Sequence, residues 1–135
     1  MDDLLATRVS EIMVSNVISI KKNEKIVDVA SLMIKHHINA LPVLDDENKL
    51  RGIVSTYDLL LILAVRTFNR NMSIESVFQT AGKPLSIYED QTLADVITLL
   101  LKQHIKTIPV INRDGQLTGV ISVSTILEYI MKKSR

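Results

Sequence analysis

The chain shows two similar successions of helical and strand-like patterns of apolar and polar residues. Apolar residues recur at i, i+3, i+4 and i+7 in two stretches, which is the spacing of a helix with one buried face. In the first stretch they are Ile26, Val29, Ala30 and Met33. In the second stretch they are Leu93, Val96, Ile97, Leu100 and Leu101. The pattern predicts two amphipathic helices in corresponding places.

Apolar runs of strand length surround each predicted helix. A short run precedes it, at residues 17–20 and 85–87. The run after it contains a proline, which a helix interior excludes, in ALPVL and in TIPVI. Polar turns then lead to the runs LRGIVS and LTGVIS, each of which continues into a last helix. Each half of the chain is therefore predicted to have the order β-α-β-β-α.

The two halves align without a gap at an offset of 67 residues. HHINALPVLDDENKLRGIVSTYDLL matches QHIKTIPVINRDGQLTGVISVSTIL, so that the prolines, glycines and serines coincide. A register of this length indicates an internal repeat. A repeat of about 60 residues buries too little surface to be robust alone. We therefore expect an α/β (α+β) fold, with two tandem βαββα repeats packed around a pseudo-twofold axis and two equivalent clefts between them.

The repeat suggests a linear division of the chain. Residues 1–66 form the first repeat, with TRVSEIM as its N-terminal lead-in. Residues 67–79 form a linker with a short helix over 74–78, which Ser73 is placed to cap. Residues 80–135 form the second repeat.

Composition narrows the classes of function. The net charge is +1, which gives no strong field for nucleic acid or a membrane surface, and aromatic residues are only 4% of the chain. There is no Cys, so disulfides and thiolate chemistry are excluded. The N-terminus lacks the pattern of a signal peptide. The longest apolar run, LLLILAV, is far shorter than the about 20 residues of a membrane helix. We expect a cytoplasmic protein with no nucleic-acid or membrane partner.

Two motifs within the repeats are informative together. The first repeat contains H-x-x-x-x-P-V, from His37 to Val43, and G-h-h-S-x-x-D, from Gly52 to Asp58, where h is an apolar residue. Tandem βαββα repeats with these motifs resemble a pair of cystathionine β-synthase (CBS) domains, also called a Bateman module. The resemblance covers about residues 8 to 132. It implies a regulatory module that is not an enzyme and requires no cofactor, and that binds AMP, ADP, ATP or S-adenosylmethionine between the repeats. It also implies a disc-like homodimer.

The resemblance assigns a main ligand site. Asp58 would hold the ribose hydroxyls, while Ser55 and Thr56 would meet ribose or phosphate. A helix beginning near Thr56 would also direct free backbone amides and its positive dipole end at a phosphate. The second repeat would supply the adenine pocket from Thr80, Pro84, Leu85, Ser86, Ile105, Lys106, Thr107 and Pro109.

The resemblance also implies a second site, in which the second repeat supplies the helix start and the first repeat supplies the adenine pocket. Its residues are Ile18, Ile38, Asn39, Ala40, Pro42, Ser122 and Thr125. Here the sequence departs from the family pattern, because GVISVST places Thr125 where the carboxylate should be. A threonine has no fixed negative charge and offers one oxygen to a diol. We therefore expect this site to be weak or empty.

Structural interpretations stand beside the functional ones. Ser55 and Asp58 also have the spacing of a capping box, but Ser122 has no acid three residues on, so a helix start does not require one. Lys106 is placed either to neutralise phosphate or to be solvated. The adjacent His36 and His37 would point apart on a helix, so no metal site is expected. The LLLILAV run indicates burial or a partner surface.

Two other functions remain open. The first is a ligand-independent dimerisation or partner-docking module, which the missing acid at Thr125 and the apolar closing helix favour. The second is an enzyme that uses a nucleotide as its substrate, although the chain has no P-loop, no G-x-S-x-G motif and no evident acid pair.

Overall fold

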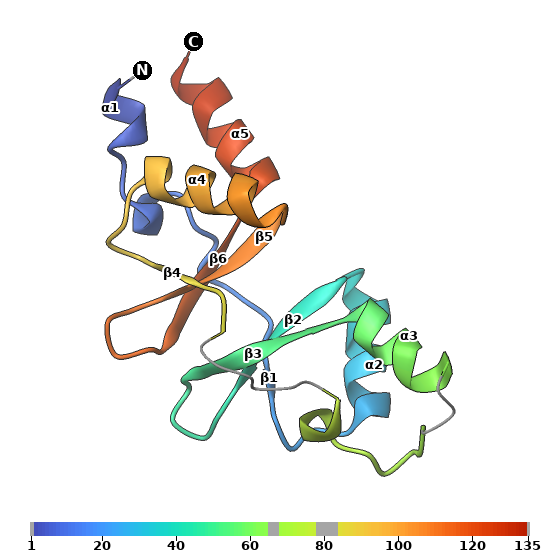
Figure 1. Ribbon diagram of the computed structural model, residues 1–135. Helices are drawn as coiled ribbons and strands as arrows, with labels where there is room; N and C mark the ends of the chain where they lie inside the picture. The colour runs from blue at the N-terminus through green and yellow to red at the C-terminus, as the bar shows by residue number, and fades with distance from the viewer. Residues whose placement is uncertain (1, 65–67, 78–83, 135) are drawn as a thin grey trace. The chain divides into compact units, whose positions relative to one another are not determined.

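The computed structural model describes residues 2–64, 68–77 and 84–134. Its contacts divide the chain into two units (Figure 1). One is Ile18–Pro84, called here the first-repeat unit. The other combines Met1–Val17 with Leu85–Arg135 and is called the second-repeat unit. Each unit contains one three-stranded sheet.

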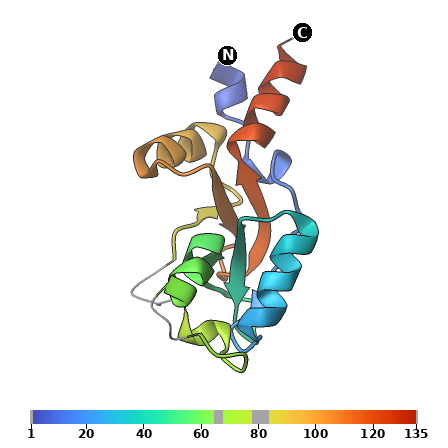
Figure 2. The same ribbon diagram turned by 90° about the vertical axis from the view of Figure 1, so that its right-hand side faces the viewer.

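The first-repeat unit has the predicted βαββα order. Its elements are β1 (Ile20–Lys21), α2 (Ile26–His36), β2 (Ala40–Leu44), β3 (Leu50–Ser55), α3 (Thr56–Ala64) and the 3-10 helix η2 (Ile74–Ser76). Strand β2 is central and pairs in parallel with β1 and antiparallel with β3. Helix α2 connects the parallel strands (Figures 1 and 2). It also contacts α3.

The second-repeat unit repeats this arrangement. Its elements are α1 (Asp2–Leu5), the 3-10 helix η1 (Val9–Glu11), β4 (Ile87–Tyr88), α4 (Leu93–Gln103), β5 (Thr107–Ile111), β6 (Leu117–Ser122) and α5 (Val123–Lys133). The sheet order is β4-β5-β6, again with one parallel and one antiparallel pair. Both sheets shift register at the same point, after Val43 and after Val110. The two repeats therefore share not only the order of their strands but also the position of the irregularity in the sheet.

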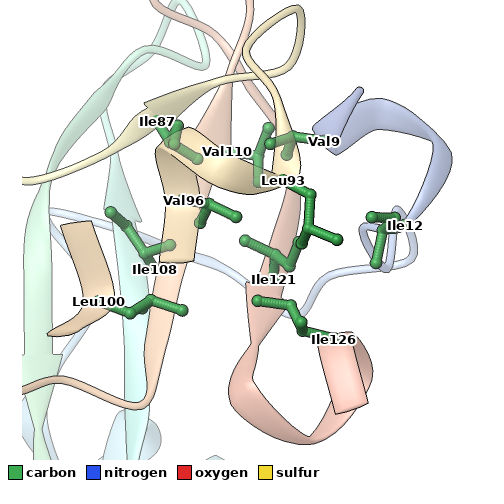
Figure 3. Close-up of a cluster of buried hydrophobic side chains, with 10 residues drawn as sticks. All are labelled: Val9, Ile12, Ile87, Leu93, Val96, Leu100, Ile108, Val110, Ile121 and Ile126. Atoms are coloured by element: carbon green, nitrogen blue, oxygen red, sulfur yellow. The ribbon is translucent and has the colours of Figure 1, made fainter. Parts of the chain in front are cut away.

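The predicted apolar faces of α2 and α4 form the two cores. In the first-repeat unit the buried cluster is Ile20, Ile26, Val29, Met33, Leu41, Val43, Val54 and Ile74. In the second it is Val9, Ile12, Ile87, Leu93, Val96, Leu100, Ile108, Val110, Ile121 and Ile126 (Figure 3). Each core thus lies between the sheet and its helices and includes one 3-10 segment.

The N-terminal lead-in packs on the second repeat. Val9 is fully buried there, and its amide donates to the Gln91 carbonyl at 2.8 Å. The amide of Leu93 donates to the Thr7 carbonyl, also at 2.8 Å. The linear division, which gave the lead-in to the first repeat, differs from this packing. The physical reason is that residues 7–14 pack apolar side chains into the core of the second repeat and form hydrogen bonds with its backbone.

In the first-repeat unit, η2 occupies the position that corresponds to that of the lead-in. Ile74 is fully buried, its amide donates to the Glu24 carbonyl at 2.8 Å, and the amide of Ile26 donates to the Met72 carbonyl at 2.9 Å. These bonds correspond to those of Val9 and Leu93. The predicted short helix therefore exists over Ile74–Ser76, but the Ser73 side chain does not cap it, which contradicts our expectation. Of the rest of the predicted helix, Val77 is the C-cap of η2 and Phe78 lies outside the described residues.

Gly119 allows the lead-in to approach β6. The amides of Val14 and Val120 donate to each other's carbonyls, both at 2.9 Å, so the lead-in extends the sheet locally. A Cβ atom on Gly119 would lie 2.6 Å from the Met13 sulfur and 2.9 Å from the Val14 carbonyl oxygen. Glycine is therefore required by close packing, as its position within a strand suggested.

The apolar LLLILAV run lies largely in α3, a helix of nine residues. Val65, at the end of the run, is outside the described residues. Within the described ranges, the model contains no helix whose length and apolar character would let it cross a membrane.

The packing of the lead-in on the second repeat generates a prediction for Val9→Ala. Removing two buried methyl groups should lower the free energy of unfolding by about 1–3 kcal/mol. The loss should appear as weaker amide hydrogen-exchange protection in residues 87–126. The matched variant Ile74→Ala should instead weaken protection in residues 20–55. A larger effect of Val9→Ala on the first-repeat unit than on the second would contradict the packing described here.

Candidate functional site

Ser55 and Asp58 form a reciprocal pair where β3 passes into α3. The Ser55 amide donates to Asp58 Oδ2 at 2.7 Å, and the Ser55 hydroxyl donates to the same oxygen at 3.0 Å. In return, the Asp58 amide donates to Ser55 Oγ at 3.2 Å. The capping-box interpretation is therefore confirmed. Among the described residues, the bonds to this carboxylate end on Oδ2, which leaves Oδ1 available to an outside donor.

The second repeat caps its helix without an acid. The Thr125 amide donates to Ser122 Oγ at 3.2 Å, and the two hydroxyl oxygens are 3.0 Å apart. Helix α5 starts at the position that corresponds to the start of α3. The helix start itself therefore does not require a carboxylate, and the cap alone does not explain the presence of Asp58.

The start of β2 lies directly beside this turn. Ala40 pairs with Ser55, and the Thr56 amide donates to the Asn39 carbonyl at 2.9 Å. The second repeat is the same, with Thr107 opposite Ser122 and the Val123 amide donating to the Lys106 carbonyl at 2.9 Å. Each unit thus brings a strand start and a helix start together at one edge.

This arrangement corrects one expectation about α3. The sequence suggested that the helix would direct free amides near Thr56 at a phosphate. The Thr56 and Asp58 amides are instead occupied by Asn39 and Ser55. Among these first three described residues of the helix, the Tyr57 amide is the one that remains for a ligand. The helix dipole is unaffected, because it sums over the whole helix.

The other predicted residues are distributed over both units. Of those in the first-repeat unit, Ile18, Ile38 and Pro84 are partly buried and Asn39 and Ala40 are exposed. In the second-repeat unit, Ser86 and Ile105 are partly buried, Leu85, Lys106 and Thr107 are exposed, and Ser122 and Thr125 are partly buried. Thr80 lies outside the described residues. Each predicted site therefore consists of residues from both units, and its residues are described here unit by unit.

Pro42 and Pro109 are buried, unlike the other predicted site residues in the described ranges. Both lie in central strands, where proline is unusual because it has no amide hydrogen for the sheet. The parallel neighbour β1 pairs only with Val43 and Leu44, and β4 pairs only with Val110 and Ile111. Among the described residues, the parallel neighbour therefore does not pair with the proline, and no sheet hydrogen bond is lost on that side.

An apolar groove between α2 and α3 was not identified from the sequence. It has a volume of about 640 Å³. Its lining is Ala30, Met33, Ile34, His37, Ile38, Asn39, Thr56, Leu59, Leu60 and Leu63. Three predicted site residues, Ile38, Asn39 and Thr56, are among these lining residues. The corresponding groove between α4 and α5 is about 220 Å³ and is lined by Ile97, Leu100, Leu101, Val123, Ile126, Leu127 and Ile130.

Helix α3 presents its leucines to the surface. None of its residues is buried, and Leu60, Leu61 and Leu63 are 58%, 61% and 55% exposed. Ile34, on the neighbouring helix α2, is 76% exposed. Of the two sequence interpretations of the LLLILAV run, core burial is therefore wrong for these side chains. An apolar patch of this kind typically marks a contact surface.

The histidines that follow α2 and α4 have a backbone role. His37 and His104 both adopt the left-handed conformation, with φ of 53° and 54°, and end their helices. Within the described ranges, no group of three His, Asp or Glu side chains is arranged to hold a metal ion.

Comparison with curated proteins gives relatives of several kinds. A homoserine O-acetyltransferase of Methanococcus vannielii is 29% identical over 122 residues, which are 90% of this chain and 24% of that protein. The chloroplastic CBS domain-containing protein CBSX2 of Arabidopsis thaliana is 26% identical over 143 residues, covering 86% of this chain and 59% of its own length. This chain thus spans about a quarter of the first relative and less than two thirds of the second.

Solved structures show the same fold. The structure of CBSX2 in complex with AMP has a TM-score of 0.82 and 25% identity, covering 96% of this chain and 99% of that one. The CBS domain pair of protein MJ0100, in complex with 5-methylthioadenosine and S-adenosyl-L-methionine, has a TM-score of 0.76 and 26% identity, covering 95% and 98%.

The family model of the CBS domain matches this chain twice, at residues 9–65 and 74–132. The two matches correspond to the two repeats found in the sequence, and together they include most of the chain. The chain therefore belongs to the CBS domain family and contains a pair of CBS domains.

Proposed function

We propose that this CBS pair is a regulatory module that binds an adenosine-containing ligand: AMP, ADP, ATP or S-adenosylmethionine. The observation that carries the proposal is the Asp58 carboxylate, which Ser55 holds through Oδ2 while Oδ1 stays available. The complexes of two similar CBS pairs, with AMP and with 5-methylthioadenosine and S-adenosyl-L-methionine, support this class of ligand. These molecules share a ribose, so ribose is the part that Asp58 would recognise.

The proposed recognition uses charge-assisted hydrogen bonds. A carboxylate oxygen accepts hydrogen bonds from the vicinal hydroxyls of a ribose, each contributing about 1.5–3 kcal/mol. The exposed Thr56 hydroxyl and the Tyr57 amide would then meet ribose or phosphate. As the family resemblance implies, the ligand would lie between the repeats, with the segments around Leu85 and Ile105 forming the adenine pocket. Ligand binding would thereby couple to the conformation of the pair.

The second site is proposed to be weak or empty. Thr125 carries no charge, and its hydroxyl is engaged with Ser122 Oγ at 3.0 Å. A ribose would have to displace that contact and would gain only one neutral acceptor. We therefore propose one principal ligand per chain.

We also propose that the module is a homodimer. The support is the exposed apolar surface of α3 and of its neighbour α2, where four aliphatic side chains are more than half exposed: Ile34, Leu60, Leu61 and Leu63. Burying these side chains against a partner would remove them from water, which favours association.

The same surface supports the main alternative, in which the chain is a dimerisation or partner-docking module that binds no nucleotide. The two functions differ in one respect that can be measured. Only the sensor has a ligand whose affinity depends on Asp58.

The prediction for the ligand site concerns Asp58→Thr. This variant places in α3 the residue, Thr, that α5 has at the corresponding position, Thr125. The cap should survive, as it does at Ser122 and Thr125, so thermal stability should change little. Affinity for the nucleotide should fall by about 10- to 150-fold, because a charge-assisted bond of about 1.5–3 kcal/mol is lost. Titration calorimetry with AMP, ADP, ATP and S-adenosylmethionine, on native and variant chains, measures both the ligand and the loss.

The matched control is Thr125→Ala, which alters the corresponding position of the second repeat and should leave this affinity unchanged. The native protein must first be shown to carry no nucleotide from purification. If the native chain then binds none of the four ligands, the sensor proposal fails and the docking module is favoured. Equal affinity of the native chain and Asp58→Thr would remove Asp58 from the site.

A separate prediction concerns the proposed homodimer. Light scattering should give the mass of two chains at micromolar concentration, in the absence of nucleotide. Because the proposed contact is apolar, the dimer should persist when salt screens charge interactions. A monomer at every concentration tested, or a dimer that dissociates on adding salt, would count against this part of the proposal.

A further inference from the structure

We propose that Arg113 positions residues 85–86 of the second repeat, which belong to the proposed adenine pocket, by fastening the strand that follows them to the β5–β6 hairpin. This inference rests on the ligand function proposed above and concerns the main site. Arg113 lies outside the predicted ligand-binding residues and is therefore a positioning residue, which acts on the site through β4.

Two kinds of contact join Arg113 to β4 and the turn after it. The guanidinium donates two hydrogen bonds to the Asp90 carboxylate, from Nε to Oδ2 at 3.0 Å and from Nη2 to Oδ1 at 2.8 Å. It also lies over the Tyr88 ring, with its carbon 3.9 Å from the ring centroid. An arginine that is both bidentate and stacked has a defined orientation. The hairpin is thereby fastened to the last residue of β4 and to the following turn.

The charges of this pair stabilise the contact without making it a core interaction. The hydrogen bonds from Arg113 lower the pKa of Asp90 below its usual value, and the same bonds raise the pKa of Arg113. Both side chains are therefore charged at neutral pH. They are 64% and 38% exposed, for Arg113 and Asp90 respectively. Exposed pairs contribute little to global stability, but an ideal bidentate geometry can still fix local orientation.

Strand β4 benefits from this fastening because it is short. It consists of Ile87 and Tyr88, which pair with Val110 and Ile111. Ile87 is buried in the core, and successive side chains of a strand point to opposite faces. The core therefore holds one face of β4, while Arg113 holds the side chain of the next residue. Residues 85–86 lie directly before this strand and outside it, so their direction depends on how firmly β4 is held.

The first repeat fastens its corresponding strand with different side chains. Lys21, which corresponds to Tyr88 at the offset of 67, donates from Nζ to the Asp45 carbonyl and to Asn48 Oδ1, both at 2.9 Å. Asp45 and Asn48 lie in the β2–β3 hairpin. In this repeat the cation is on the strand, whereas in the second repeat it is on the hairpin, as Arg113. The same connection is thus made in both repeats by unrelated residues, which indicates that the position of this strand matters in each.

The test combines amide hydrogen exchange with titration calorimetry on the native chain and on Arg113→Ala. In the ligand-free variant, residues 85–92 should exchange at least about threefold faster, because β4 is held less firmly. Affinity should fall about three- to tenfold for whichever of AMP, ADP, ATP and S-adenosylmethionine the native chain binds. The reason is that the ligand must then order the segment itself, which costs binding free energy.

A second variant, Asp90→Asn, tests whether Arg113 acts through its pair. It removes the charge of the acceptor and should weaken affinity in the same direction. The double variant should lose no more affinity than Arg113→Ala alone, since both changes remove one interaction. Additive losses would show that the two residues act independently and would overturn the proposed fastening.

Lys21→Met is the matched control, because it removes the connection of the first repeat and keeps an unbranched side chain. Strand β1 supplies none of the residues predicted for the main site. Exchange in residues 18–24 should therefore become faster while affinity changes less than about twofold. A loss equal to that of Arg113→Ala would overturn a specific role for Arg113. Circular dichroism and thermal unfolding verify that each variant is folded.

The two measurements separate this inference from the ligand function. If Arg113→Ala exchanges faster but binds like the native chain, or if its exchange is unchanged, the positioning role is overturned and the ligand function stands. If the native chain, freed of nucleotide, binds none of the four ligands, the ligand function fails and the positioning role fails with it.

Discussion

The core of each CBS repeat of this chain is completed by a segment from outside its βαββα sequence, which contributes a fully buried apolar side chain. Val9 does this in the second repeat and Ile74 in the first, and both are fully buried. Their amides donate to equivalent carbonyls in the turn before the main helix, at 2.8 Å in each case. A sheet of three strands with two helices leaves one side of its core open, and a repeat of this size has little apolar surface to spare. The position of α2 and α4, and hence of the strand starts that follow them, depends on closing that side.

The closed cores position the residues that are proposed to bind the ligand. At the end of β3 the chain turns directly into α3, where Ser55 fixes one oxygen of Asp58 and leaves the other available. A residue held in this way pays little conformational entropy when it accepts a hydrogen bond from a ligand. The second repeat achieves the same helix start with a hydroxyl pair. The difference between the repeats therefore lies in the side chain at this position, Asp58 or Thr125, and not in the formation of the helix start.

Much of the fold could be predicted from the sequence because it is determined by local patterns. The spacing of Val29 and Met33 and the prolines of ALPVL and TIPVI located helices and strands, and the register between the repeats gave their order. The packing of the lead-in on the second repeat could not be predicted, because it depends on contacts between residues far apart in the sequence, such as the hydrogen bond from the Val9 amide to the Gln91 carbonyl. The use of the Thr56 amide by Asn39 also depends on pairing between strands, which local spacing does not reveal. The α2–α3 groove could not be predicted either, because its presence depends on how the two helices pack and on the exposure of α3 at the surface.

The discontinuity of the second-repeat unit affects the order of folding. The first-repeat unit, Ile18–Pro84, is one continuous segment, whereas the other unit joins Met1–Val17 to Leu85–Arg135. During synthesis the first repeat can acquire all its own strands while residues 1–17 still lack a partner. Val14 meets Val120 only after most of the chain has been made. Contacts between such distant residues are slow to form, because a long loop must close first. Residues 1–17 are made before the first repeat and are nevertheless among the last residues to be incorporated, and until then β6 exposes an unpaired edge on which another chain could add a strand.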